Sequence, residues 1–244
     1  KKLSVAPERG IKWVAPDGTR ADKVLAEVER HMAAAKITRE LRVAHRGADL
    51  RCFPSSSPLY EEPWDEAFDI MQCSRVRLGE PVLVLANAPG FAYVFTSYAE
   101  GWIDPAALTP ALADDQAKAY LAPEDEVVVQ ADRIPVWSSP KDGALLGMVR
   151  LGIRLPLQAE PATPGGRLRV ALPTPSGLSQ GWLDDNANLT RGFPALTRAA
   201  VITRALSLLG SPYGWGGVGG TRDCSRLMMD LFGGFGLLLP RNSW

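Results

Sequence analysis

A chain of 244 residues with 46% hydrophobic and 22% charged residues has the composition of a globular protein and the length for two or three small domains. Its 27 basic and 27 acidic residues give a formal net charge of +0, which provides no electrostatic reason to expect a nucleic acid or an anionic membrane as partner. No apolar run approaches about 18 residues, so no membrane-spanning helix is expected, and the first residues lack the apolar core of a signal peptide.

The first predicted element is a helix over residues 20–37, in which Val24, Val28 and Met32 fall on one face at helical spacing. The segment around it, residues 1–47, is too short to bury a core of its own. We therefore expect an arm or clip that packs on a neighbouring domain.

Short strands and turns follow over residues 48–107, in keeping with the 20 Pro and 23 Gly of the chain. In this first domain, residues 81–86 and 91–95 are joined by Asn87-Ala-Pro-Gly90, which predicts a β-hairpin. Residues 108–122 are rich in Ala and Asp, and we expect a linker or a short helix there.

A second copy of the first domain is predicted over residues 123–190, because two short motifs recur there. Val76-Arg-Leu-Gly79 returns as Val149-Arg-Leu-Gly152, and Gly101-Trp-Ile-Asp104 returns as Gly181-Trp-Leu-Asp184. A run of short strands that ends in Gly-Trp resembles the bacterial SH3-type barrels. We therefore expect two tandem domains of one fold.

The C-terminal segment, residues 191–244, holds two predicted helices separated by a glycine-rich loop that starts at Gly210. Asp223 is a suitable N-cap for the second helix, which puts Cys224 in its first turn. Unpaired backbone N–H groups and the helix dipole favour a thiolate there, and the thiolate is the reactive form of cysteine. Each helix has an apolar side, made of Val201, Ile202, Ala205 and Leu209 in the first and of Leu227, Met228, Leu231 and Phe232 in the second.

Three motifs of this segment together resemble the NlpC/P60 cysteine peptidases of bacteria: Tyr213-Gly-Trp-Gly-Gly217, Asp223-Cys-Ser225 and Leu239-Pro-Arg-Asn-Ser243. The resemblance implies a multi-domain fold class, β plus α+β. An N-terminal helical clip and two tandem SH3-like β-barrels would precede the helical start of a papain-like NlpC/P60 domain. It also implies a hydrolase of the bacterial periplasm or cell envelope. Its partner would be the peptidoglycan stem peptide, cleaved between γ-D-glutamate and the diamino acid.

The same resemblance assigns roles to single residues. Cys224 is the nucleophile that forms an acyl-enzyme, and its backbone N–H at the helix N-terminus stabilises the oxyanion. The other expected substrate contacts are Asp223 and Tyr213 on the free amine of the stem peptide, Ser225 and Ser243 as hydrogen-bonding groups, and Tyr98, or alternatively Tyr93, from the first barrel.

Two features depart from the family pattern. Arg226 stands where the family most often has Gly, and we expect it to narrow the pocket or to change a contact with substrate. The family's base is a His downstream of the Cys, but the 20 residues after Cys224 contain none. The contexts of His31 and His45 indicate solvated or structural roles. We therefore expect the base outside the given sequence, in a further part of the catalytic domain or in a second polypeptide.

Other interpretations stay open. A non-catalytic module that binds the cell wall would keep Cys224 as a relic, and lone cysteines are often small buried apolar residues. A related amidase or acyltransferase would use the same Cys and His layout. Cys52 and Cys73 form either a disulfide, as suits an oxidising compartment such as the periplasm, or two reduced core cysteines. The three cysteines lack metal-ligand spacing, so we expect neither a metal nor another cofactor.

Overall fold

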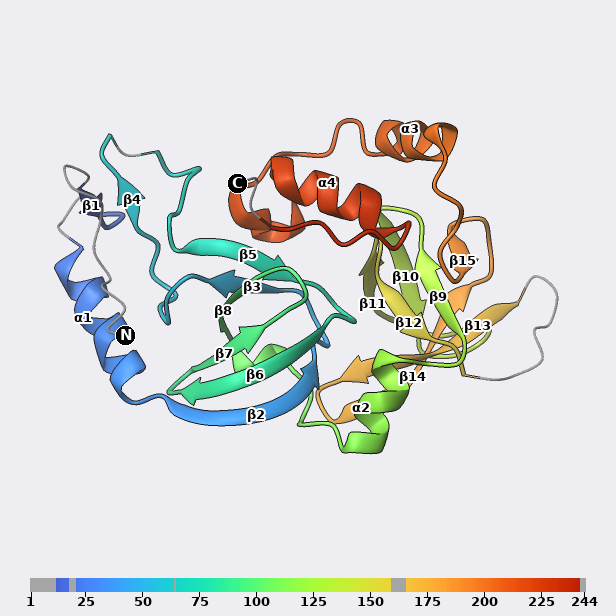
Figure 1. Cartoon of the computed structure of the whole chain (residues 1–244), viewed down its shortest axis with the longest axis horizontal. Coiled ribbons are helices and arrows are strands. Elements are labelled where there is room, and N and C mark those ends of the chain that lie inside the picture. The colour runs from blue at the N-terminus through green and yellow to red at the C-terminus, as the bar shows by residue number, and fades with distance from the viewer. Residues whose placement is uncertain (1–11, 18–20, 64, 159–165, 242–244) are drawn as a thin grey trace.

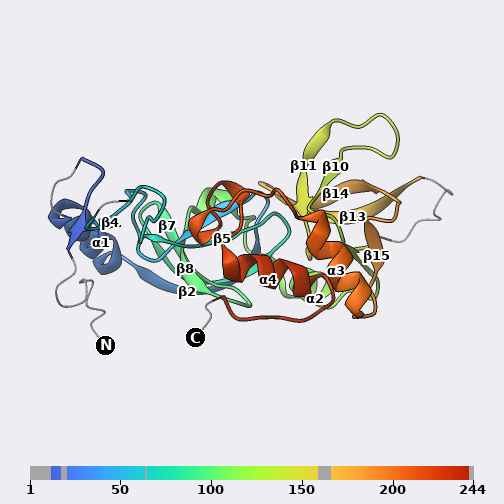
Figure 2. The ribbon, with the colours of Figure 1, turned by 90° about the horizontal axis from the view of Figure 1, so that it is seen from above.

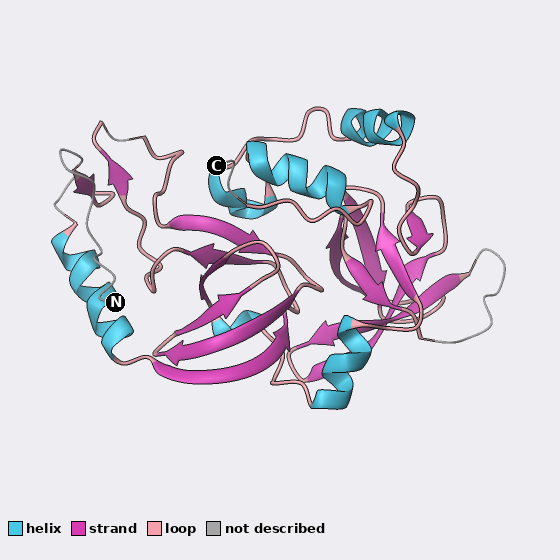
Figure 3. Ribbon diagram, viewed as in Figure 1, coloured by secondary structure: helices cyan, strands magenta, loops and turns pink. Residues whose placement is uncertain are grey.

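The computed structural model describes residues 12–17, 21–63, 65–158 and 166–241. Two β-sheet units follow one another along the chain, an N-terminal helix packs on the first, and a helical C-terminal segment lies against both (Figure 1). Seen from above, helix α4 (Cys224–Gly233) again lies over the region between the units (Figure 2). Strands make up most of the regular structure (Figure 3).

The first β unit is a six-stranded antiparallel sheet with the order β2-β6-β7-β8-β3-β5. The predicted hairpin is confirmed, since β6 pairs with β7 across a turn in which Gly90 has a φ of 76°. One face of the sheet buries an aliphatic core that includes Leu50 and Val94. The strands are β2 (Lys36–Val43), β3 (Ala48–Arg51), β5 (Gln72–Val76), β6 (Pro81–Ala88), β7 (Phe91–Phe95) and β8 (Glu100–Ile103).

The second β unit has a four-stranded sheet, β11-β10-β14-β13, and a three-stranded sheet, β12-β9-β15. An isolated bridge between Leu157 and Val170 joins the two sheets, and both bury side chains in one core. The strands are β9 (Glu126–Val129), β10 (Arg133–Trp137), β11 (Leu145–Arg150), β12 (Arg154–Pro156), β13 (Arg167–Thr174), β14 (Gly177–Asp184) and β15 (Leu189–Arg191).

The recurrence of sequence motifs corresponds to a recurrence of strand order. In the second unit β9, β12, β13, β14, β10 and β11 take the places of β2, β6, β7, β8, β3 and β5. The two Val-Arg-Leu-Gly motifs end at equivalent turns, where Gly79 and Gly152 have φ values of 90° and 80°. Among the described residues neither unit closes hydrogen bonding into a complete barrel, so the expected barrels are open sheets in this structure.

Helix α1 (Asp22–Ala33) packs on the first unit, as expected of an arm. Val24 and Val28 are buried against Leu59 and Met71, next to the short pair β1 (Trp13–Val14) and β4 (Tyr60–Glu61). The helix ends earlier than predicted because the chain turns into β2, which pairs along β6 as an edge strand. The first sheet thus includes residues that the sequence alone assigned to the arm.

Cys52 and Cys73 form a disulfide that links the end of β3 to β5. Of the two alternatives that the sequence left open, a disulfide or two reduced cysteines, the structure has the disulfide. The bond closes a loop with a sequence separation of 21 residues. Replacing both cysteines by Ala is expected to lower the free energy of unfolding by about 3 kcal/mol, because the unfolded chain regains the entropy of that loop. Urea denaturation at neutral pH measures the change, and an unaltered midpoint would contradict the expectation.

The units are connected by η1 (Pro105–Ala107) and helix α2 (Asp114–Leu121), which confirms a short helix in the linker. Tyr120 of α2 is buried and donates a hydrogen bond from its hydroxyl to the carbonyl oxygen of Gly79 at 2.9 Å. No helix in the described part of the chain has the length and apolar character needed to cross a bilayer.

Helix α3 (Arg198–Ser207) is capped by Thr197, whose hydroxyl accepts the backbone N–H of Ala200, but its predicted apolar side faces solvent. Ile202 is 58% exposed and Leu209, just beyond the helix, is 76% exposed. The helix is instead held through its other side, where buried Arg204 donates to the carbonyl oxygen of Leu231 at 3.0 Å. An apolar face on the outside of the C-terminal segment is therefore a feature of this structure.

Candidate active site

Cys224 is the first residue of α4, and its thiol is free and exposed. The prediction that Asp223 caps this helix is confirmed, because its Oδ1 accepts the backbone N–H of Arg226 at 2.9 Å. The sulfur therefore sits where backbone N–H groups without helical partners and the positive end of the helix dipole meet solvent. The exposed thiol does not fit the alternative in which Cys224 is a small buried apolar residue.

The glycine-rich loop before the helix is held in place by the first unit. Gly216, in η2 (Trp215–Gly220), has a φ of 60° and lies so close to Gln72 that a Cβ would be 2.7 Å from that residue's carbonyl oxygen. Gln72 in turn donates from Nε2 to the carbonyl oxygen of Gly216 at 3.3 Å. The backbone N–H of Gly216 donates to Oδ2 of Asp223 at 3.1 Å, so loop, sheet and helix cap form one connected structure.

Gly216→Ala is expected to lower the free energy of unfolding by about 1–3 kcal/mol, because it adds a contact with Gln72 to the cost of a left-handed backbone. Gly210→Ala is the matched control, since Gly210 has a φ of 79° but nothing within 4 Å of an added Cβ. Denaturant titration of both variants separates the free-energy cost of the contact with Gln72 from the cost of the left-handed backbone. Equal losses of unfolding free energy in the two variants would contradict the close packing of Gly216.

Arg241 is the site residue that sequence reasoning missed as a functional group. Its guanidinium binds both carboxylate oxygens of Asp223, donates from Nη1 to Oγ of Ser225, and donates from Nε to Oγ of Ser74 at 2.9 Å. The sequence contained a signal for this residue, because Arg241 lies within the Leu-Pro-Arg-Asn-Ser motif. Ser243, the predicted contact of that motif, lies outside the described residues.

Asp223 is ionised in this setting. Burial would raise the pKa of its carboxyl group, but the hydrogen bonds from Arg241 and from the Arg226 backbone outweigh burial and hold the pKa below 3.8. Both oxygens are thus engaged within the protein, and the hydroxyl of Ser225 also contacts Asp223 at 3.2 Å. The predicted role of Asp223 toward a substrate amine and that of Ser225 as a hydrogen-bonding group stay predictions, and Arg241 is an additional partner of both residues.

Tyr213 lies close enough to Asp223 and Cys224 to interact with their charges. Its side chain is exposed, and its backbone forms an isolated bridge with Arg222. Desolvation raises the pKa of the phenol, and the charges of Asp223 and Cys224 raise it further. The structure therefore brings Tyr213, Asp223, Cys224 and Ser225 into one neighbourhood, as predicted.

Tyr98 is placed under α4, with its hydroxyl engaged by the protein. The hydroxyl lies 2.8 Å from Oε2 of Glu80 and 3.1 Å from the carbonyl oxygen of Arg75, and the ring faces the guanidinium of Arg226 at 5.2 Å. Burial and the charge of Glu80 raise its pKa well above the usual range. The alternative residue, Tyr93, packs on Trp102 with ring centroids 5.1 Å apart.

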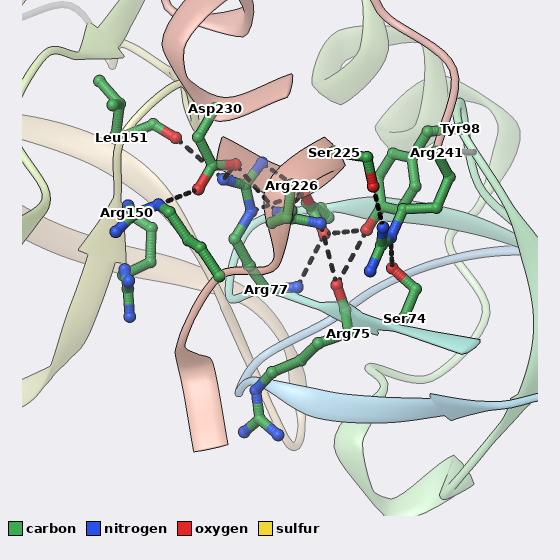
Figure 4. A network of polar contacts seen from close by, with 12 residues as sticks. Ser74, Arg75, Arg77, Tyr98, Arg150, Leu151, Ser225, Arg226, Asp230 and Arg241 are labelled. Atoms are coloured by element: carbon green, nitrogen blue, oxygen red, sulfur yellow. Dashed lines mark hydrogen bonds and ion pairs between the residues drawn. The ribbon is translucent and has the colours of Figure 1, made fainter. Parts of the chain in front are cut away.

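Arg226 does not reach into a substrate pocket, which corrects the expectation from sequence. Its side chain is buried beneath α4, where Nε donates to Oδ1 of Asp230 at 2.9 Å (Figure 4). Arg222 and Arg77 bind the same carboxylate, at 2.8 and 2.7 Å. Arg226 and Asp230 are four positions apart on α4 and share its inner face, whereas Arg222 reaches the same carboxylate from the loop before the helix.

Neither histidine lies at this site. His31 is on α1, where it contacts Glu27 and packs edge-on against Phe91, and α1 is at the far end of the first unit from α4 in both views (Figures 1 and 2). His45 has its Nε2 at 2.9 Å from the carbonyl oxygen of Ala106. In the described part of the chain, no group of three or more His, Cys, Asp or Glu residues is arranged to hold a metal ion.

Two solved structures resemble this chain in fold. An NlpC/P60 endopeptidase from Photobacterium damselae subsp. piscicida superimposes with a TM-score of 0.75 at 17% identity, over 95% of this chain and 52% of that protein. An NlpC/P60 family protein from Bacillus cereus ATCC 10987 superimposes with a TM-score of 0.63 at 21% identity, over 83% of this chain and 75% of that protein. No protein-family model and no curated protein sequence matches the chain.

These likenesses establish the fold of the chain as one shared with NlpC/P60 proteins over most of its length. The chain spans about half the length of the Photobacterium endopeptidase.

Proposed function

We propose that this chain is the cysteine-bearing part of a bacterial cell-wall peptidase that hydrolyses the peptidoglycan stem peptide. The observation that carries the proposal is the free, exposed thiol of Cys224 at a capped helix N-terminus, in a chain with the fold of NlpC/P60 endopeptidases. Fold alone does not define an activity, but a nucleophile at this position adds the chemical group that such a hydrolase needs.

In the proposed reaction the sulfur of Cys224 attacks the carbonyl carbon between γ-D-glutamate and the diamino acid. A tetrahedral oxyanion forms and the backbone N–H of Cys224 stabilises it. Its collapse expels the amine and leaves an acyl-enzyme, which water then hydrolyses. Tyr213 and the Asp223–Arg241 pair would position the free amine of the peptide, with Ser225, Ser243 and Tyr98 as further contacts.

The base in this proposal is a histidine supplied by polypeptide outside the given sequence. The exposed apolar side chains of the C-terminal segment support further polypeptide at this place, because large apolar side chains left in water favour a contact that buries them. A further segment or a second polypeptide that covered these side chains would also be well placed to bring an imidazole to Cys224. The exposed residues are Ile202, Leu206, Leu209, Leu227, Met228, Leu237 and Leu238.

The two β units would be SH3-type domains of this peptidase, a proposal supported by their shared strand order. The Cys52–Cys73 disulfide supports location in an oxidising compartment such as the periplasm or cell envelope. Neither nucleic acid nor a membrane span is part of the proposed function.

A non-catalytic wall-binding module is the second candidate, favoured by the positions of His31 and His45 away from Cys224. An amidase or acyltransferase with the same residues is a third. The masses of products formed by the complete protein from free stem peptides and from sugar-linked muropeptides separate the three. From free stem peptides we expect a dipeptide ending in D-glutamate and a peptide beginning with the diamino acid. Release of the whole peptide from the sugar would indicate an amidase, and retention on cell walls without any cleavage would indicate a binding module.

A further inference from the structure

A basic pocket of about 280 Å³ lies where the two β units meet the glycine-rich loop. Cys224 is not among its lining residues, so it is separate from the candidate active site. The first unit, the second unit and the loop with α4 each form one wall. Asp230 is the carboxylate on the lining, whereas its arginines are Arg46, Arg75, Arg77, Arg133, Arg150 and Arg226.

The charges around this pocket do not balance. Asp230 and Asp132 also bind Arg222, which brings the cluster to seven arginines. Among the described residues the carboxylates that pair with these seven arginines number five, so this part of the cluster has an excess of two positive charges in a partly desolvated place. The five are Asp49, Glu80, Asp104, Asp132 and Asp230.

Arg150 is little exposed to solvent and only weakly compensated. Its carboxylate partner, Asp132 at 3.1 Å, is shared with Arg222 and with Arg133. The Nε of Arg150 is buried and has no hydrogen-bond acceptor among the described residues. Burial lowers the pKa of its guanidinium, and the neighbouring arginines lower it further. A half-buried cation whose charge is only partly balanced is costly unless an anion beside it completes the balance.

Glycines bring the backbone up against the guanidinium groups. A Cβ at Gly220 would be 3.2 Å from Nη1 of Arg150, and a Cβ at Gly47 would be 3.1 Å from Nη2 of Arg75. The guanidinium of Arg75 points away from the Asp230 network (Figure 4), and its Nη1 donates to Oδ1 of Asp49 at 2.5 Å. Cationic donors thus approach the pocket from separate walls, which suits a tetrahedral anion better than a planar one.

We propose that this pocket binds a phosphate group, held between Arg150 of the second unit and Arg75 of the first beside the glycine-rich loop. The excess of two charges matches a phosphate monoester dianion, and a phosphodiester of a polymer would present the same tetrahedral oxygens with one charge. A bound phosphate would tie both β units to the loop that precedes Cys224. The proposal rests on the pocket alone and does not depend on the peptidase activity.

Isothermal titration calorimetry at constant ionic strength tests the proposal, with inorganic phosphate, dimethyl phosphate and acetate as separate probes. We expect one phosphate per chain and at least about tenfold weaker binding to Arg150→Gln, because charge-assisted hydrogen bonds are lost. Without phosphate, Arg150→Gln should unfold at the same or a higher temperature than wild type. Arg154→Gln is the matched control, since its guanidinium pairs with Glu126 outside the pocket.

Tighter binding of inorganic phosphate than of dimethyl phosphate would assign the site to monoesters, and the reverse order would assign it to a phosphodiester. If Arg150→Gln does not fold, Arg75→Gln provides the same test from the other wall, because its guanidinium contacts the half-exposed Asp49. The proposal is overturned if phosphate shows no saturable binding, if acetate binds as tightly, or if Arg154→Gln weakens binding as much as the pocket variants do.

Discussion

Asp230→Asn is expected to lower the free energy of unfolding by about 3–5 kcal/mol, a large part of the stability of an ordinary domain. The substitution keeps the shape of the side chain and removes its charge. Arg77, Arg222 and Arg226 then lose the carboxylate that they share beneath α4. Because Arg77 belongs to the first β unit, the loss also weakens the attachment of α4 to that unit. Chemical denaturation monitored by tryptophan fluorescence measures the effect.

Asp125→Asn is the matched control for this prediction, since Asp125 pairs with Arg191 at 3.1 Å on the exposed surface. The control should cost about 0–1 kcal/mol, as is usual for surface ion pairs. Equal losses in the two variants would contradict a special role for the buried network.

The same network predicts how stability changes with pH. Burial would raise the pKa of Asp230, but its arginines outweigh burial, so the folded-state pKa lies below the ordinary value of 3.8. The resulting stabilisation is complete above the unfolded-state pKa and is lost as the pH falls through the folded-state pKa. Wild type should therefore lose stability more steeply than Asp230→Asn in the acid range.

Arg241→Gln is expected to reduce hydrolysis of muropeptides by the complete protein at least about 100-fold, if the proposed function holds. The substitution removes the bidentate partner of Asp223, which caps the nucleophile helix. Without that partner the pKa of Asp223 rises, because burial is no longer opposed by the guanidinium. The acidic limb of the pH–rate profile should therefore move to higher pH.

Ser74→Ala is the control for Arg241, because it removes the contact at Nε and leaves the carboxylate pairing in place. Its activity should stay within about threefold of wild type. A pH profile of Arg241→Gln that matches wild type would show that Arg241 acts only on stability.

Local patterns predicted much of this structure. The cap and position of Cys224, the 81–95 hairpin and the duplicated strand order all follow from spacing, turn residues and repeated motifs. Such features depend on neighbours in sequence, which periodicity and propensity can detect. Arg226 and Asp230, four positions apart on α4, also share a helix face in a way that the sequence makes visible.

The partners across the fold were not predictable. Arg77 and Asp230 are 153 residues apart, and no periodic signal links them. Arg226 was expected near substrate, but the carboxylate of Asp230 on the same helix face draws it inward. The sequence shows an apolar side on α3 and on α4. Hydrophobicity alone, however, does not indicate which other surface packs against such a side. Burial by another part of the protein is a tertiary property.

The most direct test of this account compares the complete protein with its Cys224→Ala variant on purified muropeptides, with products measured by mass. Cleavage by wild type and a loss of at least about 1,000-fold in the variant, at unchanged thermal stability, is the predicted result. Equal cleavage by the two proteins would remove Cys224 from the reaction and contradict the account.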